Sequence, residues 1–181
     1  GLRFIFPHAP FRSITINNGM TMRAWYDIMS LDRTGVQDED GIRQSALMVE
    51  SLIEKENKRG IESERIIIAG FSQGGAIALH SALRCPQRLG GLLALSTYLP
   101  LEFTLKNDVI ENEKSQSREL PIFLAHGQYD PVIQFNLGVQ TRIMLEEMKY
   151  SVLWNEYPMD HAVCQDEIKD IGLWISKILM S

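Results

Sequence analysis

The order of apolar and polar positions along the chain predicts strands and helices in alternation. Short apolar runs rich in branched side chains, each bounded by turn-forming residues, predict strands at residues 2–6, 66–69, 89–96, 121–127 and 152–157. Longer stretches with apolar residues at helical spacing predict helices from Asp38 to just before Gly60 and at residues 75–83, 135–148 and 164–179. This alternation is typical of βαβ units around a mostly parallel sheet flanked by helices, and we expect a single domain over residues 1–181.

Two stretches do not follow the alternation. Residues 7–37 are too long and too mixed in character for a simple connection, and they contain the pair Trp25 and Tyr26. Long loops on α/β scaffolds often carry substrate contacts, although these aromatic residues could equally pack as a small core beneath the loop. Residues 101–119 turn polar, which predicts a solvated surface excursion or a partial lid.

The segment Gly70-Phe71-Ser72-Gln73-Gly74 lies between a predicted strand and a predicted helix. A G-x-S-x-G pattern in this position is typical of a nucleophile elbow, in which the glycines let the backbone turn sharply and leave the serine hydroxyl exposed. A small turn without any chemistry would show the same letters. The choice between the two therefore depends on partner residues elsewhere in the chain.

A serine hydroxyl needs a base that takes its proton and a carboxylate that orients this base. In α/β hydrolases the chain order is serine, acid, histidine. His8 precedes Ser72, and His80 lies within the helix predicted after it, so His126 and His161 remain as bases.

Asp130 follows the predicted strand 121–127, at the carboxyl edge where open α/β sheets carry their chemistry. The other acid in that interval, Asp108, has no predicted strand before it. Because Asp130 comes after His126, the chain order selects His161 as the base. Each residue alone could serve in a turn or cap, but together they predict a triad of Ser72, Asp130 and His161.

Composition narrows the class of partner. The net charge is −5 and the basic residues are scattered, which argues against a nucleic acid or an anionic membrane surface. Cys85 and Cys164 have neither metal-site nor disulfide-framework spacing, so we expect buried or half-buried thiols, no metal and a reducing, cytoplasmic location. Because the apolar runs are too short to cross a bilayer, we also expect no transmembrane segment.

Several longer motifs resemble the phospholipase/carboxylesterase family, which includes bacterial carboxylesterases and acyl-protein thioesterases. They are Phe6-Pro7-His8-Ala9-Pro10, residues 17–27, Gly70-Phe71-Ser72-Gln73-Gly74-Gly75, Leu95-Ser96-Thr97-Tyr98-Leu99-Pro100, His126-Gly127-Gln128-Tyr129-Asp130-Pro131-Val132 and His161. The resemblance implies a cofactor-free α/β-hydrolase acting on carboxylic esters or acyl thioesters, often with lysophospholipase activity. It assigns nucleophile, acid and base to Ser72, Asp130 and His161, and one oxyanion-hole donor to the backbone N–H of Gln73. It also allows a homodimer.

The chain departs from this family at its start. The family's first strand and its His-Gly-rich loop, which supplies the second oxyanion donor, would lie upstream of Gly1. That strand would sit between the strands predicted at residues 2–6 and 66–69. We therefore expect an N-terminally incomplete domain that lacks a central strand.

The function expected from the sequence is hydrolysis of carboxylic esters through an acyl-enzyme, on a small-molecule or lipid substrate. One alternative is an acyl-protein thioesterase, with acylated protein as the substrate. The other is a catalytically silent relative that binds a lipid or a protein through the Trp25 loop. We expect substrate contacts from Trp25, Tyr98 and Leu99.

Overall fold

The computed structural model describes residues 1–29, 35–111 and 119–180. Its centre is a four-stranded parallel sheet in the order β3-β4-β5-β6. The strands are β3 (Ile67–Phe71), β4 (Gly91–Leu95), β5 (Pro121–Gly127) and β6 (Ser151–Tyr157). These match the strands predicted from residue 66 onward to within a few residues at each end.

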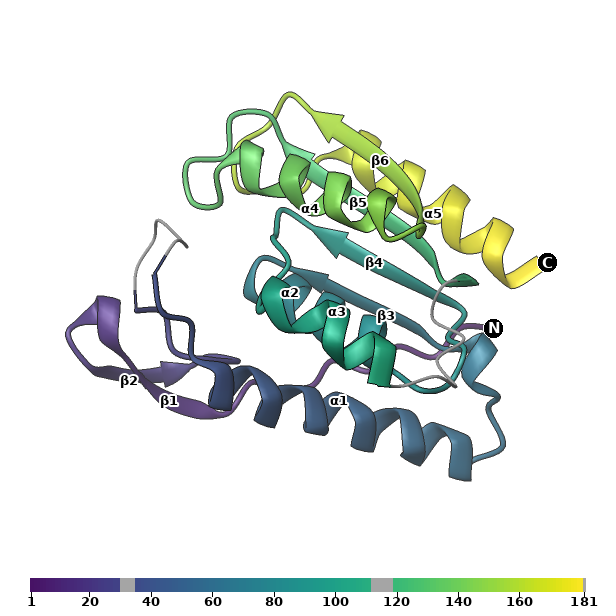
Figure 1. Ribbon diagram of the computed structural model, residues 1–181. Coiled ribbons are helices and arrows are strands. Elements are labelled where there is room, and N and C mark those ends of the chain that lie inside the picture. The colour runs from purple at the N-terminus through teal and green to yellow at the C-terminus, as the bar shows by residue number, and fades with distance from the viewer. Residues whose placement is uncertain (30–34, 112–118, 181) are drawn as a thin grey trace.

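Helices cover both faces of this sheet (Figure 1). They are α1 (Glu39–Lys58), α2 (Gln73–Arg84), α3 (Glu102–Glu111), α4 (Phe135–Glu147) and α5 (Gln165–Met180). Alternate residues of the strands point to opposite faces, so Leu92 and Leu124 pack in the main core with residues of α1, α2, α3 and α4. Leu93 and Phe123 pack on the other face against Trp174 of α5.

The start of α1 follows directly from its sequence. Asp38 accepts a hydrogen bond from the backbone N–H of Gly41, and two acidic residues occupy the first turn. Ile42, Ala46 and Ile53 are buried on its inner side. The helix therefore confirms the prediction for residues after Asp38, and it ends just before Gly60.

The strand predicted at residues 2–6 is wrong. This segment forms no ladder with any described strand, and Leu2, Phe4 and Phe6 are exposed. The rings of Phe4 and Phe6 stack at 6.2 Å, as alternate residues of an extended chain can. Branched and aromatic residues favour extended backbone locally, but a strand also needs hydrogen bonds from a neighbour.

Two stretches contain elements that were not expected. Residues 7–37 contain a hairpin of β1 (Phe11–Ile14) and β2 (Met20–Arg23) joined through the 3-10 turn η1 (Thr15–Asn17). Asn18 and Gly19 adopt positive φ in that turn, a common hairpin signal that the mixed composition obscured. The polar stretch from residue 101 begins as α3, anchored by Arg84, which donates to Asp108 and to Thr104.

Candidate active site

The site is built around Ser72, the single residue between β3 and α2. Its backbone has φ 54° and ψ −123°, a conformation that residues with a side chain rarely adopt. Ser72 is the N-cap of α2, yet its hydroxyl makes no capping hydrogen bond. The hydroxyl is therefore left for chemistry, as a nucleophile elbow requires.

Two glycines make this sharp turn sterically accessible. A Cβ on Gly70 would overlap the backbone of Gly74, and a Cβ on Gly75 would press against the side chain of Thr97 at 2.8 Å. Gly74 has more room, since the nearest atom to a Cβ there would be Trp25 Nε1 at 3.7 Å. The close approach that defines the elbow thus depends on Gly70 and Gly75.

The three residues predicted as a triad are joined by hydrogen bonds. Ser72 Oγ lies 2.9 Å from His161 Nε2, and His161 Nδ1 lies 2.7 Å from Asp130 Oδ2. Asp130 Oδ1 accepts from the backbone N–H groups of Val132 and Ile133. With both carboxylate oxygens acting as acceptors, Nδ1 of His161 carries the proton and Nε2 faces the serine as an acceptor.

Burial differs along this chain of hydrogen bonds. The Asp130 side chain is completely buried, whereas 16% of the His161 side chain is exposed. The imidazole lies against the ring of Phe71, with centroids 4.7 Å apart. The buried carboxylate thus holds one side of the imidazole, while part of the ring stays accessible.

The loops that carry Asp130 and His161 touch each other at Gly127. A Cβ on Gly127 would overlap the carbonyl oxygens of Met159 and Asp160. The backbone N–H groups of Gln128 and Tyr129 donate to the carbonyls of Tyr157 and Met159, at 2.8 and 3.1 Å. The absence of a side chain at residue 127 therefore lets the two loops meet.

His126 lies behind this arrangement. It is fully buried, and its Nε2 lies 2.8 Å from the carbonyl oxygen of Ile133 and 3.5 Å from Asp130 Oδ2. Burial lowers the pKa of His126, so the ring is neutral. His126 lies beneath the loop that carries Asp130, which indicates that it supports this loop. The chain order alone did not suggest such a role.

The N-terminus of α2 lies next to Ser72 and gives this place a positive electrostatic potential. Gln73 is the first residue of the helix, so its backbone N–H has no acceptor within the helix. The helix dipole adds a partial positive charge at this end. An oxyanion formed next to Ser72 would meet both, in line with the role expected for the Gln73 N–H.

The other candidates considered from sequence lie elsewhere. His80 is buried in α2, and burial together with the nearby Arg84 lowers its pKa to about 3. Burial raises the pKa of Asp108, but hydrogen bonds from Arg84 and Thr104 outweigh this and leave it below its usual value. Asp108 thus belongs to the attachment of α3 to α2.

The residues expected to contact substrate have different surroundings. Trp25 is half-buried beside the first turn of α2. Tyr98 is buried, and its hydroxyl lies 2.9 Å from that of Tyr26. Leu99 is 3% exposed within the main core, so the structure does not bring its side chain to the site.

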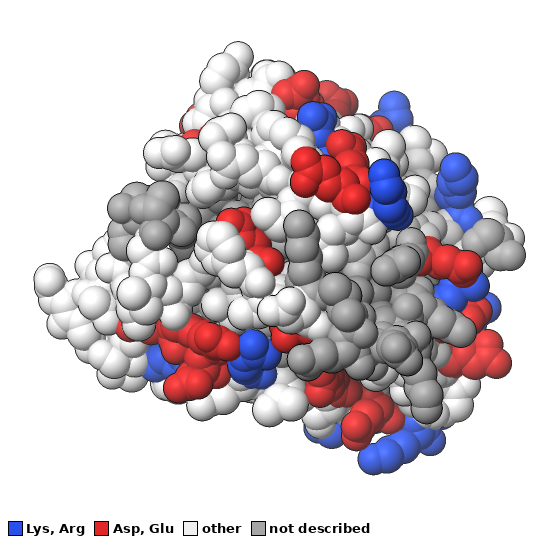
Figure 2. All heavy atoms as spheres, in the orientation of Figure 1, with Lys and Arg blue, Asp and Glu red and all other residues white. Residues whose placement is uncertain are grey.

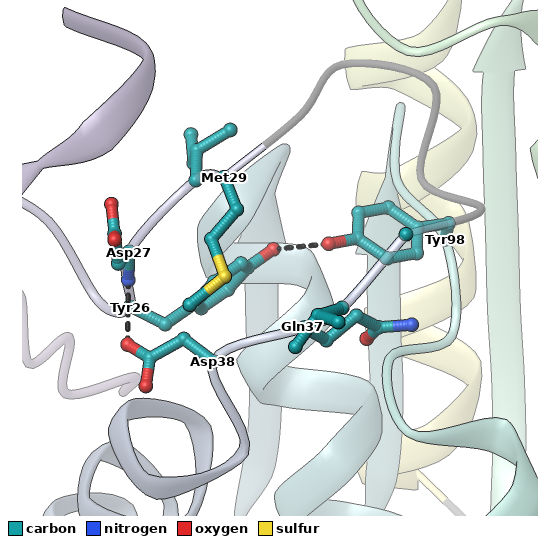
Figure 3. A pocket seen from close by; sticks show the side chains of 9 residues that line it. Tyr26, Asp27, Met29, Gln37, Asp38 and Tyr98 are labelled. Carbon is teal, nitrogen blue, oxygen red and sulfur yellow. Dashed lines mark hydrogen bonds between the residues drawn. The ribbon is translucent and has the colours of Figure 1, made fainter. Parts of the chain in front are cut away.

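A small cavity lies next to Tyr26 and Tyr98 (Figure 3). Met29, Gln37 and Asp38 also line it, and Asp38 accepts from the backbone N–H of Asp27. Its volume is about 20 Å³, which is room for about one water molecule. This cavity is therefore too small to receive an acyl chain.

Cys85 is buried and Cys164 is partly buried, as expected. On the face in Figure 2, several Lys and Arg side chains lie next to acidic ones. Within the described ranges, no group of three or more His, Cys, Asp or Glu side chains is placed to hold a metal ion. None of the described helices is long and apolar enough to cross a membrane.

The parallel sheet, the elbow and the loops at its edge define an α/β hydrolase. The chain belongs to the phospholipase/carboxylesterase family, whose model matches residues 2–179, and it is a hydrolase of that family.

Similar proteins agree with this assignment. Acyl-protein thioesterase 1 of Neurospora crassa is 44% identical over 98% of this chain and 74% of its own length. The protein of the same name from Yarrowia lipolytica is 37% identical over 97% of this chain and 78% of its own length. The crystal structure of Arabidopsis thaliana SOBER1 superposes with a TM-score of 0.88 at 31% identity, over 97% of this chain and 83% of that one. Zea mays acyl-protein thioesterase 2 gives a TM-score of 0.87 at 28% identity, over 96% and 80%.

Proposed function

We propose that Ser72, His161 and Asp130 are the nucleophile, base and acid of an enzyme that hydrolyses carboxylic acyl esters. The observation that carries this proposal is the continuous chain of hydrogen bonds from Ser72 Oγ through His161 to Asp130. Ser72 and His161 are 89 positions apart in sequence, so a chance turn or cap does not account for their contact. The strained backbone at Ser72 supports the same role.

In the first step, Ser72 Oγ attacks the acyl carbon while His161 Nε2 takes the hydroxyl proton. The carbonyl electron pair moves onto oxygen, and the Gln73 N–H at the start of α2 stabilises the oxyanion. The tetrahedral intermediate then expels the alcohol or thiol, which receives the proton from His161. The product of this step is an ester between the acyl group and Ser72.

In the second step, water attacks the acyl-enzyme and His161 takes one of its protons. Collapse of the intermediate releases the carboxylic acid and returns the proton to Ser72 Oγ. Asp130 accepts the Nδ1–H of His161 throughout, which holds the imidazole in the productive tautomer.

A protein acyl thioester is the second candidate substrate. It is favoured by the similarity to proteins named acyl-protein thioesterase 1, at 37–44% identity. The same two steps apply, with a thiolate leaving in place of an alkoxide. A thiol has a lower pKa than an alcohol, so its departure requires less help from His161.

A labelling experiment tests the nucleophile. A fluorophosphonate probe should modify Ser72, and Ser72→Ala should lose both the label and hydrolysis of p-nitrophenyl acetate, with kcat reduced roughly 10⁴-fold or more. Ser176→Ala is the matched control, since that serine is exposed on α5 and bonds only to its own helix. Labelling or turnover that survives in Ser72→Ala would refute the assignment.

A substrate panel separates the candidates. Hydrolysis of p-nitrophenyl esters from acetate to palmitate would be compared with that of an acyl thioester under the same conditions. A kcat/KM higher for the thioester at equal acyl length would favour the thioesterase. A protein that neither reacts with the probe nor turns over any substrate would instead be a silent binder.

A further inference from the structure

The side chain of Gln73 links the elbow to a distant part of the chain. Its Oε1 accepts from the backbone N–H of Trp25, and its Nε2 donates to the carbonyl oxygen of Tyr26, both at 2.7 Å. A backbone N–H can only donate and a carbonyl can only accept, so these two partners fix the orientation of the amide. The side chain thus holds this backbone as a neighbouring strand would.

The segment that contains Trp25 and Tyr26 also makes hydrogen bonds to other parts of the structure. Ser45 of α1 donates from its hydroxyl to the carbonyl oxygen of Trp25. Tyr26 is 2% exposed and its hydroxyl meets that of Tyr98, while the N–H of Asp27 donates to Asp38 (Figure 3). These contacts fix the segment to α1 and to the loop after β4, and the Gln73 amide fixes it to the residue that follows the nucleophile.

The indole of Trp25 lies over the start of α2. A Cβ on Gly74 would be 3.7 Å from Trp25 Nε1, which places the ring two residues from Ser72 along the elbow. Trp25 is half-buried, so part of the side chain is open to a ligand. The ring of Trp25 is therefore close enough to Ser72 to contact a chain that extends from an acyl group on this serine.

We propose that the Gln73 side chain is a positioning residue for the acyl group, and this inference rests on the function proposed above. One residue then has two tasks. Its backbone N–H faces the oxyanion, and its side-chain amide sets the distance between that N–H and the Trp25 backbone. The Trp25 ring thus forms a wall beside the acyl chain. This wall and the oxyanion donor are held in one fixed geometry.

This role predicts a dependence on acyl length. An acetyl group ends close to Ser72, whereas an octanoyl group continues past the elbow and needs the wall in place. A displacement of about 1 Å in a positioning element can lower a rate by about 10²-fold. Loss of the amide should therefore affect the longer substrate more than the shorter one.

The first test is Gln73→Met, which keeps the length of the side chain and removes both hydrogen bonds. We expect the ratio of kcat/KM for p-nitrophenyl octanoate to that for the acetate to fall at least tenfold, roughly the size of effect of a sub-ångström shift. Amide hydrogen exchange at Trp25 should become faster, because its N–H loses its acceptor. Gln87→Met is the matched control, since Gln87 bonds to Asn57 and Ser63 far from the elbow.

The second test is Gln73→Glu, which keeps the shape of the side chain. An ionised carboxylate can accept from Trp25 but repels the carbonyl oxygen of Tyr26, whereas a protonated carboxyl group can donate to it. For each protein we take the ratio of kcat/KM for octanoate to kcat/KM for acetate. This ratio for Gln73→Glu, divided by the ratio for the native protein, should therefore rise as the pH is lowered from 8 to 5. A residue that serves stability alone would not produce this pH-dependent rescue.

An unchanged octanoate-to-acetate ratio in Gln73→Met, with a folded and active protein, would overturn the inference about Gln73. If that variant does not fold, the absence of any pH-dependent rescue in Gln73→Glu would overturn it. Failure of the proposed function is seen separately, as a native protein that neither reacts with fluorophosphonate nor hydrolyses either ester. The hydrogen-exchange rate of the Trp25 N–H reports on the Gln73 hydrogen bonds whether or not the folded protein is catalytically active.

Discussion

Ser72 holds a backbone conformation that most residues avoid, and its hydroxyl is not used to cap the helix it begins. Asp130 is its counterpart at the other end of the hydrogen-bonded chain, with every oxygen occupied and no exposed side-chain surface. His161 lies between them, and 16% of its side chain is exposed. At the scale of single residues, the site is closed to solvent at Asp130 and partly open at His161.

Asp130→Asn should lower kcat for p-nitrophenyl acetate by about 10⁴-fold while the fold is kept. The oxygen of the new amide would stay with the N–H groups of Val132 and Ile133, so its NH₂ would face His161 Nδ1. That contact favours the tautomer with a proton on Nε2, which cannot accept from Ser72. Asp166→Asn, on the exposed side of α5, is the control, and a loss of less than tenfold would argue against Asp130 as the acid.

The elements that deliver these residues are three of the four sheet strands. β3 leads into Ser72, while β5 and β6 end in the loops that carry Asp130 and His161. In a parallel sheet these ends share one edge, so residues far apart in sequence meet there. The contact between the loops after β5 and β6 depends on Gly127, which tolerates the approach of two backbone carbonyls.

Gly127→Ala should push the 159–161 loop away from Asp130, because the added methyl group would overlap two carbonyl oxygens. We expect kcat/KM to fall about 10²-fold and the free energy of unfolding to fall by about 1–3 kcal/mol. Steady-state kinetics and urea denaturation would measure the two effects. Gly172→Ala in α5 has no neighbour within 4 Å and should leave activity unchanged, so equal behaviour of the two variants would contradict this account.

At the scale of the whole molecule, each face of the sheet has a core, and a further cluster around Tyr26 and Tyr98 includes residues of α1 and α2. Of the cores on the two faces, the larger contains residues of α1, α2, α3 and α4, and the smaller lies beneath α5. Glu167 stands near the start of α5, fully buried and with no good hydrogen bond to its carboxylate among the described residues. Burial raises its pKa to about 7, although the nearby N–H of Cys164 partly opposes this shift.

This burial predicts how stability changes with pH. The folded protein keeps the Glu167 proton up to about pH 7, whereas the unfolded chain loses it near pH 4.5, so folding binds a proton in between. The contribution of this group to stability therefore decreases as the pH rises from about 4.5 to 7, by on the order of 3 kcal/mol.

Glu167→Gln removes this dependence and should be more stable than the native protein at pH 8, with a smaller difference at pH 5. Urea denaturation at both pH values would measure it. Glu54→Gln, an exposed glutamate on α1 paired with Lys58, is the control. A difference that does not depend on pH would mean that Glu167 is ionised in the folded protein at both values.

The sequence by itself predicted most helices and strands, because the spacing of apolar residues reports directly on which faces are buried. Chain order also singled out Ser72, Asp130 and His161, which the structure joins by hydrogen bonds, although their catalytic roles stay predictions. The local sequence pattern did not predict the structure correctly where strand pairing or tertiary packing decides it. Residues 2–6 favour extended backbone without forming a ladder, and the hairpin of β1 and β2 was hidden in a mixed segment.

Other features were decided by the tertiary structure alone. The core position of Leu99, the overlap that a side chain at Gly127 would cause and the contacts of the Gln73 amide all involve segments distant in sequence. The spacing of apolar residues indicates whether a residue is buried, but it does not indicate which backbone atoms approach that residue. Those approaches follow from how the strands and helices pack, and they set the geometry in which Ser72 meets His161.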